Sequence, residues 1–195
     1  MAFLRSVSAP EAGPVVYGEN VYLRVPQIQD HPAWAELRAR SREFLTPWEP
    51  TWTASELTKV SFRRRLKHYA RDLREDMGYA FFLYRNSDDM LLGGVTLSNV
   101  RRGVTQACTL GYWVGAPHAQ QGFMTAGVTA AIPFVFDSLR LHRLEAACLQ
   151  KNTASRRLLE RTGFNQEGVA RSYLKINGVW QDHLLYALVE DDRRP

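Results

Sequence analysis

The sequence predicts an α/β domain of the α+β kind, built on a mostly antiparallel sheet. Local patterns give the order strand, two helices, three strands, helix, strand, helix and a closing hairpin. The hairpin is signalled by Asn177-Gly178 between two alternating apolar runs. With 195 residues, no internal repeat and no linker, the chain suits one domain over residues 15–195. Residues 1–14, rich in Ser, Ala and Pro, are predicted to be a flexible arm.

The first strand and helix follow from alternation and capping. Residues 18–26 alternate like a strand, with Val21 and Leu23 on one side. Asp30 is predicted to cap the next helix, with Pro32 in its first turn. One face of that helix then carries Trp34, Leu37, Ser41 and Phe44.

A helix breaker and a basic helix come next. LTPWEPTW, residues 45–52, must end the helix because it holds two prolines and two tryptophans. Residues 55–77 then place apolar side chains at helical spacing between many cations. The formal charge of +5 and the pI near 9.4 favour anionic partners. Two interpretations stay open: a solvated basic face, or a surface that lies near RNA or a ribosome. No zinc knuckle or other nucleic-acid motif supports the second.

The second half begins with a hairpin of residues 79–85 and 91–100, followed by a strand over 105–114. A helix then runs to Leu139, and Pro133 within it should cost one hydrogen bond and kink it. Residues 143–149 form a strand, and Asn152 caps a last helix that stops at Gly163. The buried faces are predicted to carry Met124, Val128, Ile132, Val135 and Leu139 on the helix, and Leu144, Ala146 and Cys148 on the strand.

Composition excludes several classes of protein. The hydrophobic fraction of 45% and charged fraction of 23% are ordinary for globular proteins. No apolar run approaches the roughly 18 residues of a membrane span, and the N-terminus does not look like a secretory signal. Cys108 and Cys148 lack CxxC spacing, which argues against a disulfide framework and a zinc site. We therefore expect a cytoplasmic protein without a metal or a membrane partner.

A Gln-Gln-Gly loop between residues 119 and 123 opens directly into the helix that runs to Leu139. Such a helix start aims unpaired N–H groups and a positive dipole end at one spot, which suits a phosphate or pyrophosphate. GxxxxGK[ST] is absent, and no GxGxxG follows the first strand. The motif therefore predicts a phosphorylated cofactor other than a nucleoside triphosphate, and it disfavours a dinucleotide.

In the order of its motifs the chain resembles the GCN5-related N-acetyltransferase (GNAT) superfamily, which uses acetyl-coenzyme A. Within it, the chain is most similar to the ribosomal-protein-alanine N-acetyltransferases. The resemblance covers about Val15 to Val189. It rests on PWEP (47–50), LGYWVG (110–115), QQGFMT (120–125), HRLEA (142–146), NTAS (152–155), LLERTGF (158–164) and residues 167–188.

The resemblance implies helices on both faces of a sheet in which strand 109–114 splays away from strand 143–149. Free backbone groups near Trp113 and Val114 would pair with the pantetheine arm of acetyl-CoA. The pyrophosphate would be surrounded by the amides of Gln120, Gln121, Gly122, Phe123, Met124 and Thr125. The superfamily's usual Gln or Arg at the first loop position is Ala119 here, which removes one minor polar contact.

The resemblance also implies a second group of cofactor-binding residues, Asn152 and Ser155. N-capping would by itself explain Asn152, but in similar enzymes the matching Asn also binds the pantetheine arm. Ser155 is the candidate catalytic residue, because the matching Ser lies near the thioester sulfur and could stabilise a departing thiolate. The tyrosine that many members place seven residues after the Asn is Leu159 here.

The sequence signals for the acceptor-binding side of the site are less specific than those for the cofactor. Glu49 is a tentative general base if the PWEP loop lines the acceptor groove, and Trp48 and Tyr112 would bind the acceptor. Trp48 could equally be a plug over the core. Cys148 is a candidate for an acetyl-cysteine intermediate, but it could equally be a thiol packed in the core. His183 is a candidate general base, but it could equally have a structural role.

Amine chemistry favours one class of acceptor. Only a neutral amine attacks a thioester, and an α-amino group has a pKa near ~8 against ~10.4 for lysine. We therefore predict a direct acetyl-CoA-dependent transfer to a protein N-terminus, in particular that of a ribosomal protein. Alternatives are acetylation of a small amine (an antibiotic, polyamine or amino acid), or a catalytically silent CoA-binding or RNA-associated module. A monomer and a homodimer both stay open.

Overall fold

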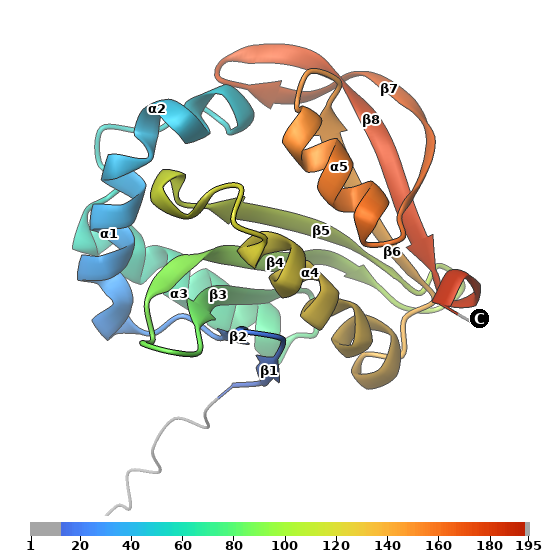
Figure 1. The fold of residues 1–195 in the computed structure, drawn as a ribbon, viewed down its shortest axis with the longest axis horizontal. Coiled ribbons are helices and arrows are strands. Elements are labelled where there is room, and N and C mark those ends of the chain that lie inside the picture. The colour runs from blue at the N-terminus through green and yellow to red at the C-terminus, as the bar shows by residue number, and fades with distance from the viewer. Residues whose placement is uncertain (1–12, 194–195) are drawn as a thin grey trace, which may run out of the picture.

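The computed structural model describes residues 13–193 and arranges them around an eight-stranded sheet (Figure 1). The prediction for residues 1–14 falls mostly on residues 1–12, which lie outside the described part. All neighbouring strands are antiparallel except β5 and β6, which are parallel. The predicted fold class is confirmed. In spatial order the strands are β1 (Val15–Tyr17), β2 (Val21–Arg24), β3 (Tyr79–Arg85), β4 (Leu91–Arg101), β5 (Ala107–Val114), β6 (Arg143–Leu149), β8 (Val179–Val189) and β7 (Asn165–Ile176).

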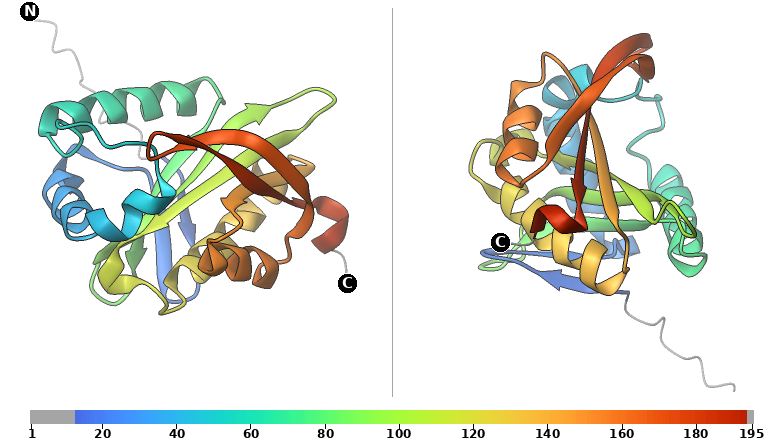
Figure 2. Two further views of the ribbon diagram at one scale, coloured as in Figure 1. Left: turned by 90° about the horizontal axis from the view of Figure 1, so that it is seen from above. Right: turned by 90° about the vertical axis from the view of Figure 1, so that its right-hand side faces the viewer.

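Helices cover both faces of this sheet (Figure 2). On one face α1 (His31–Arg40) and α3 (Lys59–Arg74) bury Trp34, Leu37 and Phe62 against Phe82, Tyr84 and Leu91. On the other face α4 (Phe123–Pro133) packs on the main core, which also includes Leu159 of α5 (Thr153–Arg161). The short α2 (Arg42–Leu45) and the 3₁₀ turns η1 (Ile28–Asp30), η2 (Thr46–Trp48), η3 (Ala116–His118) and η5 (Glu190–Arg193) complete the described elements.

Pro133 ends the regular part of the helix that follows the glycine loop. The chain continues as a π-helical turn over Phe134–Ser138, in which the Leu139 N–H donates to the Phe134 carbonyl five residues back. A proline cannot donate the usual backbone hydrogen bond, and π turns accommodate such breaks. The predicted interruption is confirmed, and the predicted inner face (Met124, Val128, Ile132, Val135 and Leu139) is buried.

Several boundaries differ from the sequence prediction. The basic helix begins at Lys59 rather than residue 55, because the Thr58 hydroxyl accepts from the Ser61 N–H at 3.2 Å and caps it. Phe44 is exposed, since the helical path is interrupted at Ser41. Asp30 precedes α1 as predicted, but its carboxylate binds the Gln27 N–H and Arg24 instead of capping α1. The short strand β1 was not predicted.

Among residues 13–193, no helix combines the length and apolar character that crossing a membrane requires.

Candidate active site

The strands β5 and β6 part halfway along their length. Their parallel pairing runs from Ala107–Arg143 to Leu110–Ala146 and then stops. Beyond that point β5 stays paired with β4 through Val114, while β6 stays paired with β8 through Leu149. Figure 1 shows the two halves of the sheet diverging from this point. One backbone edge of residues 111–114, including Trp113 and Val114, is therefore free to pair with a ligand, as the resemblance implied.

The glycine loop lies just beyond β5 and begins α4. Gly122 is the N-cap with a left-handed φ of +82°, which favours glycine, and Gln120 also has a positive φ of +58°. The Ala126 N–H bonds the Gly122 carbonyl at 3.0 Å, so the amides of residues 123–125 precede the first intrahelical bond. A Cβ placed on Gly122 would meet nothing within 4 Å, which leaves the approach to these amides open. The Met124 side chain is buried, so this residue offers only its amide.

Ser155 and Tyr112 meet across the opening between β5 and α5. The Asn152 Oδ1 accepts from the Ser155 N–H at 3.1 Å, which confirms Asn152 as the cap of α5. The Ser155 Oγ lies 2.6 Å from the Tyr112 hydroxyl. Burial raises the pKa of Tyr112, and the bond with Ser155 offsets this only in part. The phenol therefore stays protonated at neutral pH and holds the Ser155 hydroxyl at the end of the β5–β6 opening.

The two reactive side chains that the sequence offered as alternatives, Cys148 and His183, are both buried. Cys148 is buried on β6, and burial raises the pKa of its thiol, with a smaller opposing effect from Ser155. A thiol of this kind is a poor nucleophile at neutral pH. His183 is buried on β8, with Nδ1 2.9 Å from the Gln181 carbonyl and its ring against Tyr173. Within residues 13–193 no cluster of His, Cys, Asp and Glu could hold a metal ion.

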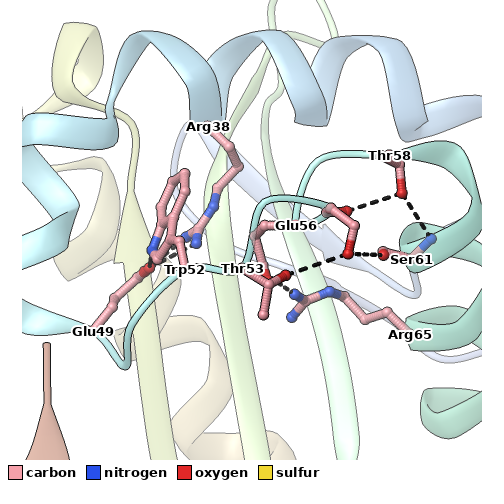
Figure 3. A network of polar contacts seen from close by, with 9 residues as sticks. Arg38, Glu49, Trp52, Thr53, Glu56, Thr58, Ser61 and Arg65 are labelled. Carbon is pink, nitrogen blue, oxygen red and sulfur yellow. Dashed lines mark hydrogen bonds and ion pairs between the residues drawn. The ribbon is translucent and has the colours of Figure 1, made fainter. Parts of the chain in front are cut away.

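Glu49, in the PWEP loop (residues 45–52), is held by an arginine and a tryptophan (Figure 3). Arg38 donates from Nη1 and Nη2 to the two Glu49 carboxylate oxygens at 2.7 and 2.6 Å. Trp52 Nε1 donates to the same carboxylate at 2.8 Å. Both carboxylate oxygens of Glu49 therefore already accept hydrogen bonds from within the protein. The contacts hold the Glu49 carboxylate in one place, and the general-base role that the sequence suggested for it stays a prediction.

A groove lies beside the PWEP loop. The Asn177 N–H donates to the Glu49 carbonyl at 2.9 Å and fastens the loop to the β7–β8 turn. Two adjoining pockets of about 550 and 480 Å³ share Lys151, Val179 and Gln181 in their walls. The larger pocket also reaches Thr46 and Pro47, the residue before Trp48. The groove thus runs between the end of α2 and the start of β8.

The predicted site residues fall into two groups. At the β5–β6 opening lie Trp113, Val114 and Ser155, together with Tyr112, which the sequence had assigned to the acceptor, and the loop of residues 120–122 joins the end of β5 to α4. Trp48 and Glu49 lie across β5 from this opening, because Tyr112 packs with the core under α4 whereas Trp113 packs with the core under α1. The sequence analysis missed Arg38 and Trp52. Arg38 follows Trp34 by one helical turn, so it falls on the buried face and needs a carboxylate partner.

Comparisons with known proteins show the family to which this fold belongs. A family model described as "Acetyltransferase (GNAT) domain" matches residues 20–165. The chain is 35% identical over 175 residues to the [ribosomal protein uS5]-alanine N-acetyltransferase of Escherichia coli (strain K12), covering 89% of this chain and 90% of that protein. Its structure is similar to that of Mycobacterium smegmatis RimJ in complex with CoA-disulfide (TM-score 0.88, 28% identity, 93% and 90% covered). It is also similar to the ribosomal-protein-S5-alanine acetyltransferase of Vibrio fischeri (TM-score 0.85, 29% identity, 94% and 100% covered).

Proposed function

The chain belongs to the GNAT family of N-acetyltransferases, and from that premise we propose that it moves an acetyl group from acetyl-CoA directly to the N-terminal α-amino group of a protein. The observation that carries this proposal is the parting of β5 and β6. It leaves a free backbone edge at residues 111–114, next to a helix start lined with amides and next to Ser155.

We assign the cofactor to the β5–β6 opening. The backbone groups of Trp113 and Val114 would pair with the pantetheine amides, and the side-chain amide nitrogen of Asn152 would add a hydrogen bond to the same arm. The N–H groups of residues 120–125 would receive the diphosphate, with the Thr125 hydroxyl beside them. Support comes from the relative RimJ, which was solved with a CoA-disulfide.

The reaction needs little acid–base chemistry from the protein. Bound acetyl-CoA supplies a thioester carbon; the amine nitrogen bonds to it, the carbon–sulfur bond breaks and the thiolate leaves. The Ser155 hydroxyl, oriented by Tyr112, would donate a hydrogen bond to that sulfur as its charge develops. The proton lost from the amine passes to water, since Glu49 is bound by Arg38 and Trp52.

The proposed acceptor is the amine that needs the least help from a base, which suits a site where Arg38 and Trp52 already bind the Glu49 carboxylate. At pH 7 roughly one-tenth of an α-amino group with a pKa of ~8 is neutral, against less than about one-thousandth of a lysine with a pKa of ~10.4. Trp48 and Glu49 would border the incoming chain, and the groove between α2 and β8 would take the residues after the first. The E. coli relative is named for alanine of ribosomal protein uS5, which supports a ribosomal acceptor.

We place the enzyme in the cytoplasm beside ribosomes. The helix α3 holds seven Lys and Arg and one Asp, a net charge of +6, while the whole chain has +5. The rest of the molecule is therefore close to neutral, and the attraction for polyanions is concentrated on this one helix. Its basic face would rest on ribosomal RNA while the groove takes the protein terminus.

The test is a comparison of acceptors with purified protein and acetyl-CoA. Released CoA is measured with a peptide that carries the N-terminal alanine of ribosomal protein uS5, with the same peptide blocked at its N-terminus, with spermidine and with an aminoglycoside. We expect turnover of the free peptide alone. Turnover of a small amine or of the blocked peptide would contradict the assigned acceptor. Binding of CoA with no turnover of any of them would indicate a silent CoA-binding module.

A further inference from the structure

Arg38 of α1 connects two segments that lie on either side of the reaction. Its guanidinium carbon is 4.2 Å from the centroid of the Trp52 ring and 4.9 Å from that of Trp113. The same group donates two hydrogen bonds to Glu49 (Figure 3). Trp52 and Glu49 belong to the PWEP loop, and Trp113 belongs to the free end of β5. One buried side chain thus joins the proposed acceptor wall to the proposed cofactor strand.

The helix that carries Arg38 is itself fixed to the end of β5. Leu37 lies so close to Gly115 that a Cβ on this glycine would overlap the Leu37 side chain. The Ser41 Oγ accepts from the Ala116 N–H at 2.9 Å, at the start of the turn that leads to the glycine loop. Because Leu37 and Ser41 are neighbours of Arg38 along α1, these two contacts hold the end of the helix that carries Arg38 against the end of β5.

The contacts of Arg38 require an arginine in particular. A planar guanidinium can stack between two aromatic rings while it donates a two-pronged hydrogen bond to a carboxylate, and a lysine ammonium cannot do both. Arg38 is only 7% exposed, and its Nε has no hydrogen-bond partner among the described residues. The two aromatic rings and Glu49 therefore determine the position of the guanidinium, even though this position leaves the Nε hydrogen bond unmade.

We propose that Arg38 is a positioning residue, which locks the PWEP loop against the free end of β5 and so fixes the distance between acceptor amine and thioester. This inference rests on the proposed function, because it assumes that the PWEP loop borders the acceptor. Geometry of this kind matters to rate, since a displacement of about 1 Å between reactants can cost about 100-fold. The carboxylate of Glu49 and the ring of Trp52 contribute to the same positioning, because both contact the Arg38 guanidinium.

The test compares Arg38→Gln and Arg38→Lys with the unmodified enzyme, using acetyl-CoA and the uS5 alanine peptide. We expect kcat/KM for the peptide to fall by about 10- to 100-fold in both variants, with KM for acetyl-CoA within about twofold. Hydrogen exchange of the amides in residues 46–52 should become faster. Trp52→Phe keeps an aromatic ring but loses the bond to Glu49, so it should show the same effects more weakly and guards against misfolding of the Arg38 variants.

Arg24 offers a matched control. It forms a similar two-pronged pair with Asp30 at 2.8 and 2.6 Å, and its guanidinium lies 4.4 Å from the Tyr84 ring centroid, outside the proposed site. Arg24→Gln should lower Tm without changing peptide kcat/KM or exchange in residues 46–52. If Arg38→Gln behaves in the same way as Arg24→Gln, Arg38 is merely structural and the inference is wrong. If the unmodified enzyme does not acetylate the peptide, the proposed acceptor fails, while the exchange comparison still decides whether Arg38 holds the loop.

Discussion

Tyr112 and Trp113 are adjacent in the chain but face different halves of the proposed site. Strand alternation turns Tyr112 toward α5, where its hydroxyl meets Ser155, and turns Trp113 toward α1, where its ring meets Arg38. A single peptide unit therefore separates the residue on the proposed leaving-group side from the residue on the proposed acceptor side. Substitutions on the two sides should consequently affect different kinetic constants.

Ser155→Ala should lower kcat by about 10- to 100-fold, because one hydrogen bond to a developing charge is lost. KM for acetyl-CoA should change little, because most of the proposed cofactor contacts come from the backbone. Thr153→Ala, an exposed neighbour in the same helical turn, is the control and should keep full activity. An unchanged kcat in Ser155→Ala would remove Ser155 from the mechanism.

The pH profile should report the acceptor amine and not Tyr112. Burial raises the pKa of Tyr112 above its usual value of 10, so the neutral phenol persists to higher pH than in an exposed tyrosine. Peptide kcat/KM should rise about tenfold per pH unit up to about 8 and then level off. A fall in rate between pH 8 and 10 that disappears in Tyr112→Phe would contradict the assignment of a neutral Tyr112.

Cys148→Ala tests direct transfer. The buried thiol has a raised pKa, so we expect kcat within about twofold of the unmodified enzyme. Initial-rate lines for varied acetyl-CoA at several fixed peptide concentrations should intersect. Parallel lines, together with loss of activity in Cys148→Ala, would instead demonstrate an acetyl-cysteine intermediate.

At the scale of elements, the most reliable predictions came from positions where the backbone has few choices. Asn177 and Gly178 have φ values of +43° and +83° in the β7–β8 turn. The helix is interrupted at Pro133 as predicted, although regular α4 ends there and the chain continues to Ser138 as a π-helical turn. The start of α3 was misplaced because the cap is Thr58 and an apolar pattern does not reveal a cap. The three residues of β1 are too few to show any period. Arg38 was missed because its partners come from a distant loop and strand.

The start of α4 can be tested by filling the space at Gly122. Gly122→Ala should weaken CoA binding, measured by calorimetry, by about tenfold or more, because φ near +82° is strained for alanine and the added methyl borders the amides. Gly103 is the control: its φ is +65° and an added Cβ would likewise meet nothing within 4 Å, but it lies on the β4–β5 turn. Equal CoA binding by Gly122→Ala and Gly103→Ala would exclude the loop as the diphosphate site.

The α3 surface can be tested by neutralising unpaired cations. Within residues 13–193, Lys59, Arg63 and Lys67 are exposed and form no ion pair. Replacing all three by Gln should weaken binding to a ribosomal RNA fragment and reduce the salt slope, log Kd against log salt, by about 2 to 3. The control replaces three exposed arginines elsewhere: Arg140, Arg157 and Arg161. If both triple variants bind RNA equally well, the basic face is only solvated.

At the scale of the whole molecule, the decisive feature is that β6 stays paired with β8 along its full length and with β5 along only part of it. The β6–β8 pairing extends over all of Arg143–Leu149, whereas the β5–β6 pairing stops at Leu110–Ala146. The residue pattern of neither strand predicts where their pairing ends. Both patterns predict apolar strands, and the tertiary fold determines which strand each one pairs with. Only the resemblance to a family predicted it. The proposed cofactor site therefore depends on the topology as much as on the motifs.

The central claim is that coenzyme A lies in this opening, and a crystal structure of the protein with bound CoA tests it most directly. We expect the pantetheine arm to pair with the backbone of residues 111–114, the diphosphate to contact the amides of residues 120–125, and the sulfur to lie beside the Ser155 hydroxyl. CoA bound elsewhere, or an opening still closed by side chains with the diphosphate away from Gly122, would contradict the account.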